Sequence, residues 1–103
     1  MHANLEPVSF TSLSGGGTLA ALHLLSVHEL HTADGVRSTL RFELRDDAGA
    51  VLASSLDTFD APVSVDDSAA LAQLCARLGL TVLDVVTEPA AERTSETVEA
   101  EPV

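Results

Sequence analysis

Three of the chain's four histidines lie within nine residues, in the stretch HLLSVHELH at positions 23–31. Imidazole side chains bind metals and act as general bases, so a small enzyme would depend on His23, His28 and His31. A zinc site needs at least three donors around one ion. On a helix, His23 lies more than two turns from His31, and on a strand the two are about 26 Å apart. We therefore predict neither a metal site nor a cofactor.

Two other features are of residue types that do chemistry in some proteins, and both have simpler interpretations. The glycine run SGGGT at 14–18 has the backbone freedom of a phosphate-binding loop, but a P-loop also requires a lysine and the chain has none. The single cysteine, Cys75, is spaced among leucines at helical intervals. A thiol in such a stripe is packed rather than nucleophilic. A lone cysteine also excludes an internal disulfide, which fits a reducing compartment, so we expect a cytoplasmic protein. Because none of these features forms a complete catalytic motif, we also expect a non-enzymatic one.

Charge and hydropathy narrow the class of partner. The 103 residues have the length of one domain and carry a net charge of -11, with five arginines as the only lysine-or-arginine residues. This charge disfavours binding to nucleic acid or to an anionic membrane, and no run of about 20 apolar residues suggests a membrane span. The mean hydropathy of +0.25 is high for so acidic a chain. It favours an apolar surface that a protein partner or a second copy covers, so a homo-oligomer is expected.

The middle of the chain shows the clearest structural pattern. Residues 36–45, VRSTLRFELR, alternate strictly between apolar or small side chains and polar ones, as a half-buried strand does. The tripeptides Ala33-Asp34-Gly35 and Asp47-Ala48-Gly49 flank this strand. We interpret each as a three-residue hairpin loop that ends in a left-handed glycine. The pattern therefore predicts a three-stranded meander in which Thr32 pairs with Val36 and Asp46 pairs with Ala50.

This register divides the meander into a core face and an arginine-bearing face. It directs His28 toward the core, opposite Leu40. The other face receives a mixture of basic and apolar side chains. Because arginine beside apolar neighbours is typical of interface cores, we interpret this face as a candidate interface. A solvated face with local carboxylates is the alternative. The candidate interface residues are Arg37, Arg41, Arg45, His23, His31, Leu25, Val27 and Phe59.

A helix is predicted at about 66–78. Asp66 and Asp67 stand at its positive end, Gly79 provides a left-handed stop, and its apolar face comprises Leu71, Leu74, Cys75 and Leu78. Short strands are expected at 6–13 and 80–86. Residues 18–25 have helical propensity, but the first hairpin requires them as a strand. The prediction is an α+β domain over 1–86, with an antiparallel meander of about four or five strands and the helix packed on one sheet face.

Residues 87–103 lose hydrophobic periodicity and carry a net charge of about -4, so they are predicted to form a disordered acidic tail. If this tail folded as a helix on a partner, it would present one acidic stripe at spacings of four, four and three. The residues of that stripe are Glu88, Glu92, Glu96 and Glu99.

Three functions are compatible with these features. The first is a protein-protein interaction module or structural accessory subunit of a larger assembly, such as a viral particle, which docks through the arginine-bearing face. The second is an acidic inhibitor or decoy that binds a basic, nucleic-acid-binding partner through the tail. The third is a small enzyme that uses the histidines. We expect the first, with a protein partner and no direct contact to nucleic acid or membrane.

Overall fold

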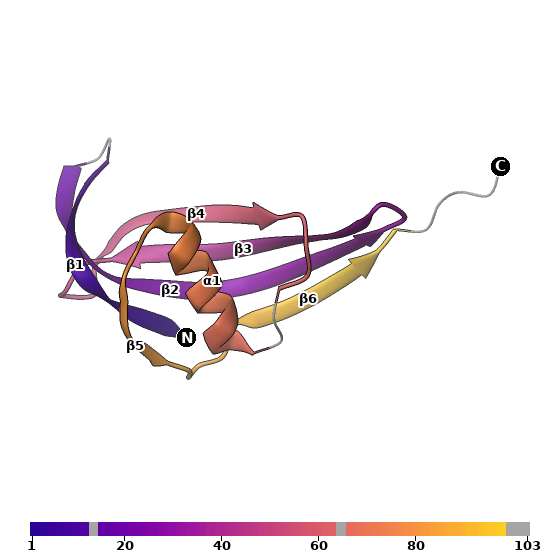
Figure 1. Cartoon of the computed structure of the whole chain (residues 1–103). Helices are drawn as coiled ribbons and strands as arrows, with labels where there is room; N and C mark the ends of the chain where they lie inside the picture. The colour runs from indigo at the N-terminus through magenta and orange to yellow at the C-terminus, as the bar shows by residue number, and fades with distance from the viewer. Residues whose placement is uncertain (13–14, 64–65, 99–103) are drawn as a thin grey trace.

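The protein is an α+β domain built on a six-stranded sheet with one helix across one face (Figure 1). The computed structural model describes residues 1–12, 15–63 and 66–98. The strand order β4-β3-β2-β1-β5 is antiparallel throughout, and β6 pairs with β2 in parallel. The predicted fold class is confirmed. The elements are β1 His2–Ser12, β2 Gly15–Thr32, β3 Gly35–Arg45, β4 Val51–Phe59, α1 Asp67–Leu78, β5 Val82–Val86 and β6 Glu92–Thr97.

Helix α1 begins and ends where the sequence predicts. The carboxylate of Asp66 caps the first turn by accepting a hydrogen bond from the Ser68 N–H, and Gly79 ends the helix in the left-handed conformation, at φ 74°. The buried positions are Ala70, Leu71, Leu74 and Cys75. Leu78, predicted to be buried with them, is 40% exposed. The buried helical face therefore stops one turn before the end of α1.

The core lies between α1 and the sheet and is almost entirely aliphatic. Its central side chains come from α1, β2 and β3, with Phe42 and Phe59 as the aromatic members. The one buried polar side chain among the described residues is Ser38, whose hydroxyl donates to the Ala61 carbonyl oxygen at 2.7 Å. Burial raises the pKa of the Cys75 thiol to about 11, so the cysteine remains a protonated packing residue.

The first hairpin has a shorter loop than predicted. Thr32 pairs with Gly35, which leaves a two-residue loop, and His31 rather than Thr32 lies opposite Val36. A shift of one residue turns alternate side chains to the other face of a sheet. As a result, His28 lies opposite Thr39 on the face away from α1, and the prediction that it points to the core opposite Leu40 is wrong.

A β-bulge at Leu25 reverses this shift in the first half of β2. Leu24 pairs with Phe42 and Ser26 pairs with Arg41, so Leu25 is the extra residue. Before the bulge in the sequence, Leu22 and Leu24 point into the core. After the bulge, Val27 points into the core.

The turn of the second hairpin forms as predicted, but the register of β4 differs from the predicted one. The Asp46 N–H donates to the Ala50 carbonyl oxygen at 3.0 Å, and Gly49 has φ 86°. The Asp46 carboxylate also accepts from the Ala48 and Ala50 N–H groups. One residue later, Arg45 pairs with Val51 but Leu44 pairs with Ala53. The irregularity at Leu52 reverses the two faces of β4 relative to the predicted register.

The acidic C-terminal segment contains a strand where the sequence predicts disorder. Residues 92–97 pair with Ser26–His31 of β2, and the Val98 N–H continues the ladder by donating to the His31 carbonyl oxygen at 2.8 Å. The Arg93 guanidinium donates to Asp67 Oδ1 at the start of α1, with the closest contact at 2.6 Å. The globular body therefore extends past the predicted boundary at 86 (Figure 1).

Candidate functional site

The sheet face opposite α1 carries most of the predicted interface residues. Arg37, Arg41 and Arg45 alternate along β3 with the buried side chains of Ser38, Leu40 and Phe42. This alternation confirms that the three arginines share one face. His23 of β2 lies on the same face because it pairs with Glu43, and the exposed Leu56 of β4 does so because it pairs with Arg41. Leu25, the extra residue of the bulge, lines a hollow together with Arg41 and therefore also belongs to this face. We call this surface, Arg37, Arg41, Arg45, His23, Leu25 and Leu56, the arginine face.

Three predicted members do not belong to the arginine face. Val27 and Phe59 are only 1% and 7% exposed and pack in the core. Phe59 lies beneath the Arg77 guanidinium of α1, 4.5 Å from ring centroid to Arg77 Cζ. His31 lies opposite Val36 on the helix side of the sheet, with its Nε2 3.5 Å from a Glu29 carboxylate oxygen. The shorter loop of the first hairpin places Val27 and His31 on the helix side of the sheet instead of the arginine face. The irregularity at Leu52 does the same for Phe59.

Most arginines of the described chain have carboxylate partners. Arg37 pairs with Asp60 at 3.3 Å, and Arg45 pairs with Glu43 at 2.7 Å. Asp57, which is close to Arg41 in the predicted register, instead faces α1 and contacts Arg77 Nε at 3.2 Å. Within residues 1–12, 15–63 and 66–98, no carboxylate lies within ion-pair distance of Arg41. Arg41 is thus an exposed cation at the centre of the face, with its charge not offset locally.

Apolar side chains frame Arg41. Leu25 is 38% exposed because the bulge pushes it out of the alternation, and Leu56, the cross-strand partner of Arg41, is 56% exposed. Together with Glu43, Ser54 and Ser55 they line an open hollow of about 410 Å³. The combination of one arginine and two leucines in a shallow depression is suited to protein contacts rather than to enclosing a small molecule.

A histidine pair lies at the β1 end of the arginine face. The rings of His2 and His23 stack with centroids 4.5 Å apart and planes 17° from parallel. Burial, together with the charges of Arg45, His2 and the N-terminal amine, lowers the pKa of His23 to about 4, against a smaller opposing effect of Glu43. His23 is therefore neutral at pH 7 and does not add to the positive charge of the arginine face.

The lowered pKa of His23 predicts a pH dependence of folding. Since the unfolded chain takes up a proton near pH 6.5 and the folded chain only near pH 4, stability should fall as the pH decreases through that window and be fully present above it. Chemical denaturation between pH 4 and pH 7 measures this. His23→Gln should remove part of the slope, whereas His31→Gln should leave it, and equal slopes in wild type and His23→Gln would contradict the prediction.

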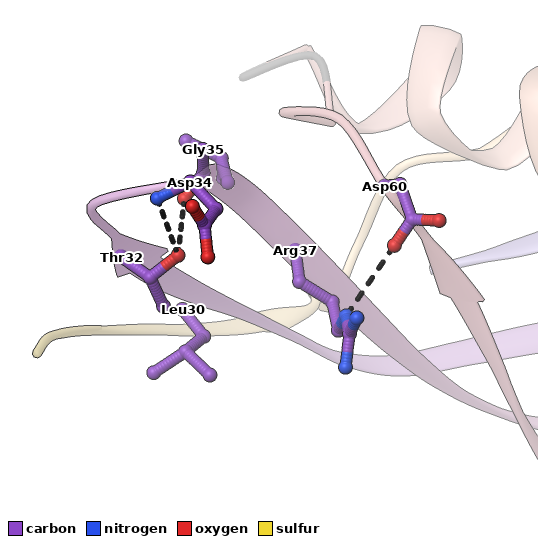
Figure 2. Close-up of a pocket in the computed structure, with 7 residues that line it drawn as sticks. Leu30, Thr32, Asp34, Gly35, Arg37 and Asp60 are labelled. Carbon is purple, nitrogen blue, oxygen red and sulfur yellow. Dashed lines mark hydrogen bonds and ion pairs between the residues drawn. The ribbon is translucent and has the colours of Figure 1, made fainter.

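A second hollow, of about 470 Å³, lies at the tip of the β2–β3 hairpin. Figure 2 shows the Arg37–Asp60 ion pair on one side and the Thr32 hydroxyl on the other, where it accepts from the Asp34 N–H at 3.2 Å and donates to the Gly35 carbonyl oxygen. Each polar group drawn with a dashed line is already engaged within the hairpin or with Asp60.

The remaining predicted residues are dispersed. His28 Nδ1 lies 2.7 Å from the Thr94 hydroxyl oxygen, and its Nε2 lies 3.7 Å from a Glu96 carboxylate oxygen, so β6 holds this histidine. Glu92 and Glu96 lie in β6 two strands away from β3, and Glu99 lies outside the described residues. Glu88, which precedes β6, is the exception, because it lines a hollow together with His23, Leu25 and Arg45 at the end of the arginine face. No signal in the sequence distinguishes His28 from the other histidines, because its contact depends on a strand 66 residues away.

The three histidines predicted as candidate catalytic residues do not come together in the described part of the chain. His23, His28 and His31 contact different neighbours, namely His2, Thr94 and Glu29. Among the described residues, no three potential metal ligands come together. The described helix also falls short of the length and apolar character that crossing a bilayer requires.

Comparisons with known proteins leave the site to be interpreted on its geometry alone. No family model matches the chain, and neither the curated proteins nor the solved structures contain a significant match to it.

Proposed function

We propose that this protein is a non-enzymatic interaction module, an accessory subunit that docks on a partner protein through the arginine face. The observation that carries the proposal is Arg41, an exposed guanidinium without a carboxylate partner among the described residues, between the exposed leucines Leu25 and Leu56. Arginine framed by apolar side chains is enriched at the centres of protein interfaces.

The charges around Arg41 indicate what the partner offers. Because Arg37 and Arg45 are already neutralised by Asp60 and Glu43, a docking surface needs to supply one carboxylate opposite Arg41 and apolar side chains around it. The hollow beside Leu25 and Leu56 accommodates the apolar part. A planar guanidinium that meets a carboxylate in a desolvated setting forms two parallel hydrogen bonds, which fixes orientation as well as adding affinity. The lone buried cysteine supports an intracellular setting for this contact.

Reversal of the Arg41 charge tests the proposal. We expect Arg41→Glu to reduce partner binding by at least about tenfold, because a desolvated arginine-carboxylate pair becomes a repulsive contact. Leu56→Ser should weaken binding less. The measurement is quantitative affinity capture from the source cells followed by titration of the captured partner against each purified variant.

The matched control is Gln73→Glu, which adds negative charge on the exposed side of α1, on the opposite face of the sheet. This variant should bind as wild type does. An unchanged set of captured proteins and unchanged affinity for Arg41→Glu, in a variant that retains the wild-type melting temperature, would refute docking through the arginine face.

A further inference from the structure

Strand β4 forms an open edge of the sheet. It pairs with β3 on one side and is the last strand in the order on the other. Its middle residues, Ser54, Ser55 and Leu56, are all exposed. An open edge presents free N–H and C=O groups, which another strand can satisfy by adding to the sheet.

The backbone groups at this edge can be assigned from the hairpin. The Asp46 N–H bonds to Ala50, and hydrogen bonding alternates along antiparallel strands, so even-numbered β3 residues such as Phe42 bond to β4. Phe42 pairs with Ser55, which directs the Ser55 backbone groups toward β3. The N–H and C=O of Ser54 and Leu56 consequently point to the free edge.

The middle of β4 carries few of the features that protect an edge. Natural edge strands are blocked by proline, by lysine, by an inward-pointing charge or by short length. β4 has nine residues, VLASSLDTF, with no proline and no basic residue, and its irregularity at Leu52 lies near its beginning. Its one charged residue, Asp57, contacts Arg77 of α1. By contrast, β5 has only five residues, and β6 carries Glu92, Arg93 and Glu96.

Charge also distinguishes β4 as the place where another copy can approach. With a net charge of -11, two chains repel each other over most of their surfaces. The edge of β4 is nearly neutral, since Asp57 is paired with Arg77. It is flanked on both faces of the sheet by exposed apolar side chains, Leu56 at 56% and Leu78 at 40% exposure. A mostly apolar hollow of about 480 Å³, which β4, the end of α1 and the β1–β2 hairpin line together, adjoins this border.

We propose that two copies of this chain pair antiparallel through their β4 strands, centred on Ser55, so that the two sheets become one. This assembly uses the backbone edge of β4, whereas docking uses the side chains of the arginine face. In this register Ser54 of one copy pairs with Leu56 of the other, and each supplies the outward N–H and C=O groups that the other lacks. The two Asp57 carboxylates stay four positions apart, roughly 13 Å at the usual strand rise.

Removal of one outward N–H tests the dimer. Light scattering after size-exclusion chromatography should give the wild type twice the chain mass of 10.7 kDa. Ser54→Pro should give the monomer mass, because proline is tolerated at an edge but cannot donate to a neighbouring strand. Ser54→Ala, which keeps the N–H, should remain dimeric. A monomeric wild type, or a folded Ser54→Pro dimer, would overturn the proposal.

A cross-link gives a second test if Ser54→Pro fails to fold. Residues that face each other without hydrogen bonds in antiparallel strands have Cα atoms about 4.5 Å apart, within the range that a disulfide spans. Ser55→Cys should therefore form a covalent dimer on mild oxidation, while Gln73→Cys on α1 should not. The native Cys75 is buried and does not compete. Absence of a Ser55→Cys dimer, with wild type dimeric, would reject this register and the β4 contact.

Variants can distinguish a failure of the proposed dimer from a failure of the proposed docking. Arg41→Glu should remain dimeric and lose the partner, because Arg41 lies on the sheet face and not at its edge. Ser54→Pro should become monomeric, but Ser54 also lines the hollow beside Arg41, so Arg41→Glu is the variant that separates the two assemblies. Loss of dimerisation in Arg41→Glu would assign self-association to the arginine face and contradict pairing through β4.

Discussion

Val27→Asp is expected to unfold much of the protein at room temperature. Val27 is 1% exposed and packs in the core, and the cation nearest to it in register, Arg93 of β6, is already paired with Asp67, so a carboxylate at this position would have to compete for that guanidinium. Burial of an unpaired charge costs at least about 3 kcal/mol, a large part of the 5–15 kcal/mol by which domains of this kind are stable. Thermal unfolding followed by circular dichroism measures the effect, and we expect the melting temperature to fall by more than about 15 °C.

His28→Asp is the matched control, one residue along the same strand. His28 lies on the opposite face, in contact with Thr94 and near Glu96, so the variant loses one hydrogen bond and places two carboxylates near each other. We expect a loss of about 1 kcal/mol. In the register predicted from the sequence, Val27 faces outward and His28 faces the core. A mild effect of Val27→Asp together with a severe effect of His28→Asp would therefore favour that register over the observed one.

The two hairpin loops explain why the sequence predicts one register correctly and misses the other. Both loops have glycine as the third residue of an Ala/Asp/Gly tripeptide. In the second loop, the Asp46 side chain precedes the tripeptide and accepts from two loop N–H groups, which stabilises a three-residue loop. In the first, Thr32 stands at that place, the loop closes between Thr32 and Gly35, and Gly35 has φ 134°, compared with 86° at Gly49.

The prediction that the three arginines share one face is correct despite the wrong register of the first hairpin, because it depends on the alternation within β3 alone. Arg37, Arg41 and Arg45 stay on one face whichever residues pair with them, whereas the assignment of Val27, His31 and Phe59 requires the register. The bulge at Leu25 has no local sequence signal, since LLSVH reads as an ordinary apolar strand. It places Leu22, Leu24 and Val27 in the core together. Packing against α1, rather than propensity, favours this arrangement.

Strand β6 could not be predicted by composition because its charge is typical of a tail. Glu92–Thr97 contains two glutamates, one arginine and no aliphatic residue. Its pairing is parallel and joins segments more than 60 positions apart in the sequence. Alternation is nonetheless present: Arg93 on the helix side contacts Asp67, while Thr94 and Glu96 on the other side approach His28. The charges that suggest disorder are the ones that attach the strand.

Truncation after Ala91, which removes residues 92–103, is expected to destabilise the domain by about 2–4 kcal/mol. It removes the strand that pairs with Ser26–His31 and leaves the Asp67 carboxylate, only 18% exposed, without the Arg93 guanidinium. The melting temperature should fall by roughly 10–25 °C. Truncation after Val98 keeps all of β6 and should melt as the full chain does. Equal melting temperatures for both truncations would contradict a structural role for β6.

This role changes how the acidic decoy must be tested. Deletion of residues 87–103 would remove both negative charge and part of the sheet, so a loss of binding would not identify the cause. The double variant Glu92→Gln, Glu96→Gln lowers the charge while keeping the β6 backbone. If the segment acts as a decoy, this variant should lose affinity for a basic partner, and the remaining binding should depend less steeply on salt. If β6 is structural, as the contact between Arg93 and Asp67 favours, the variant should bind and melt as the wild type does.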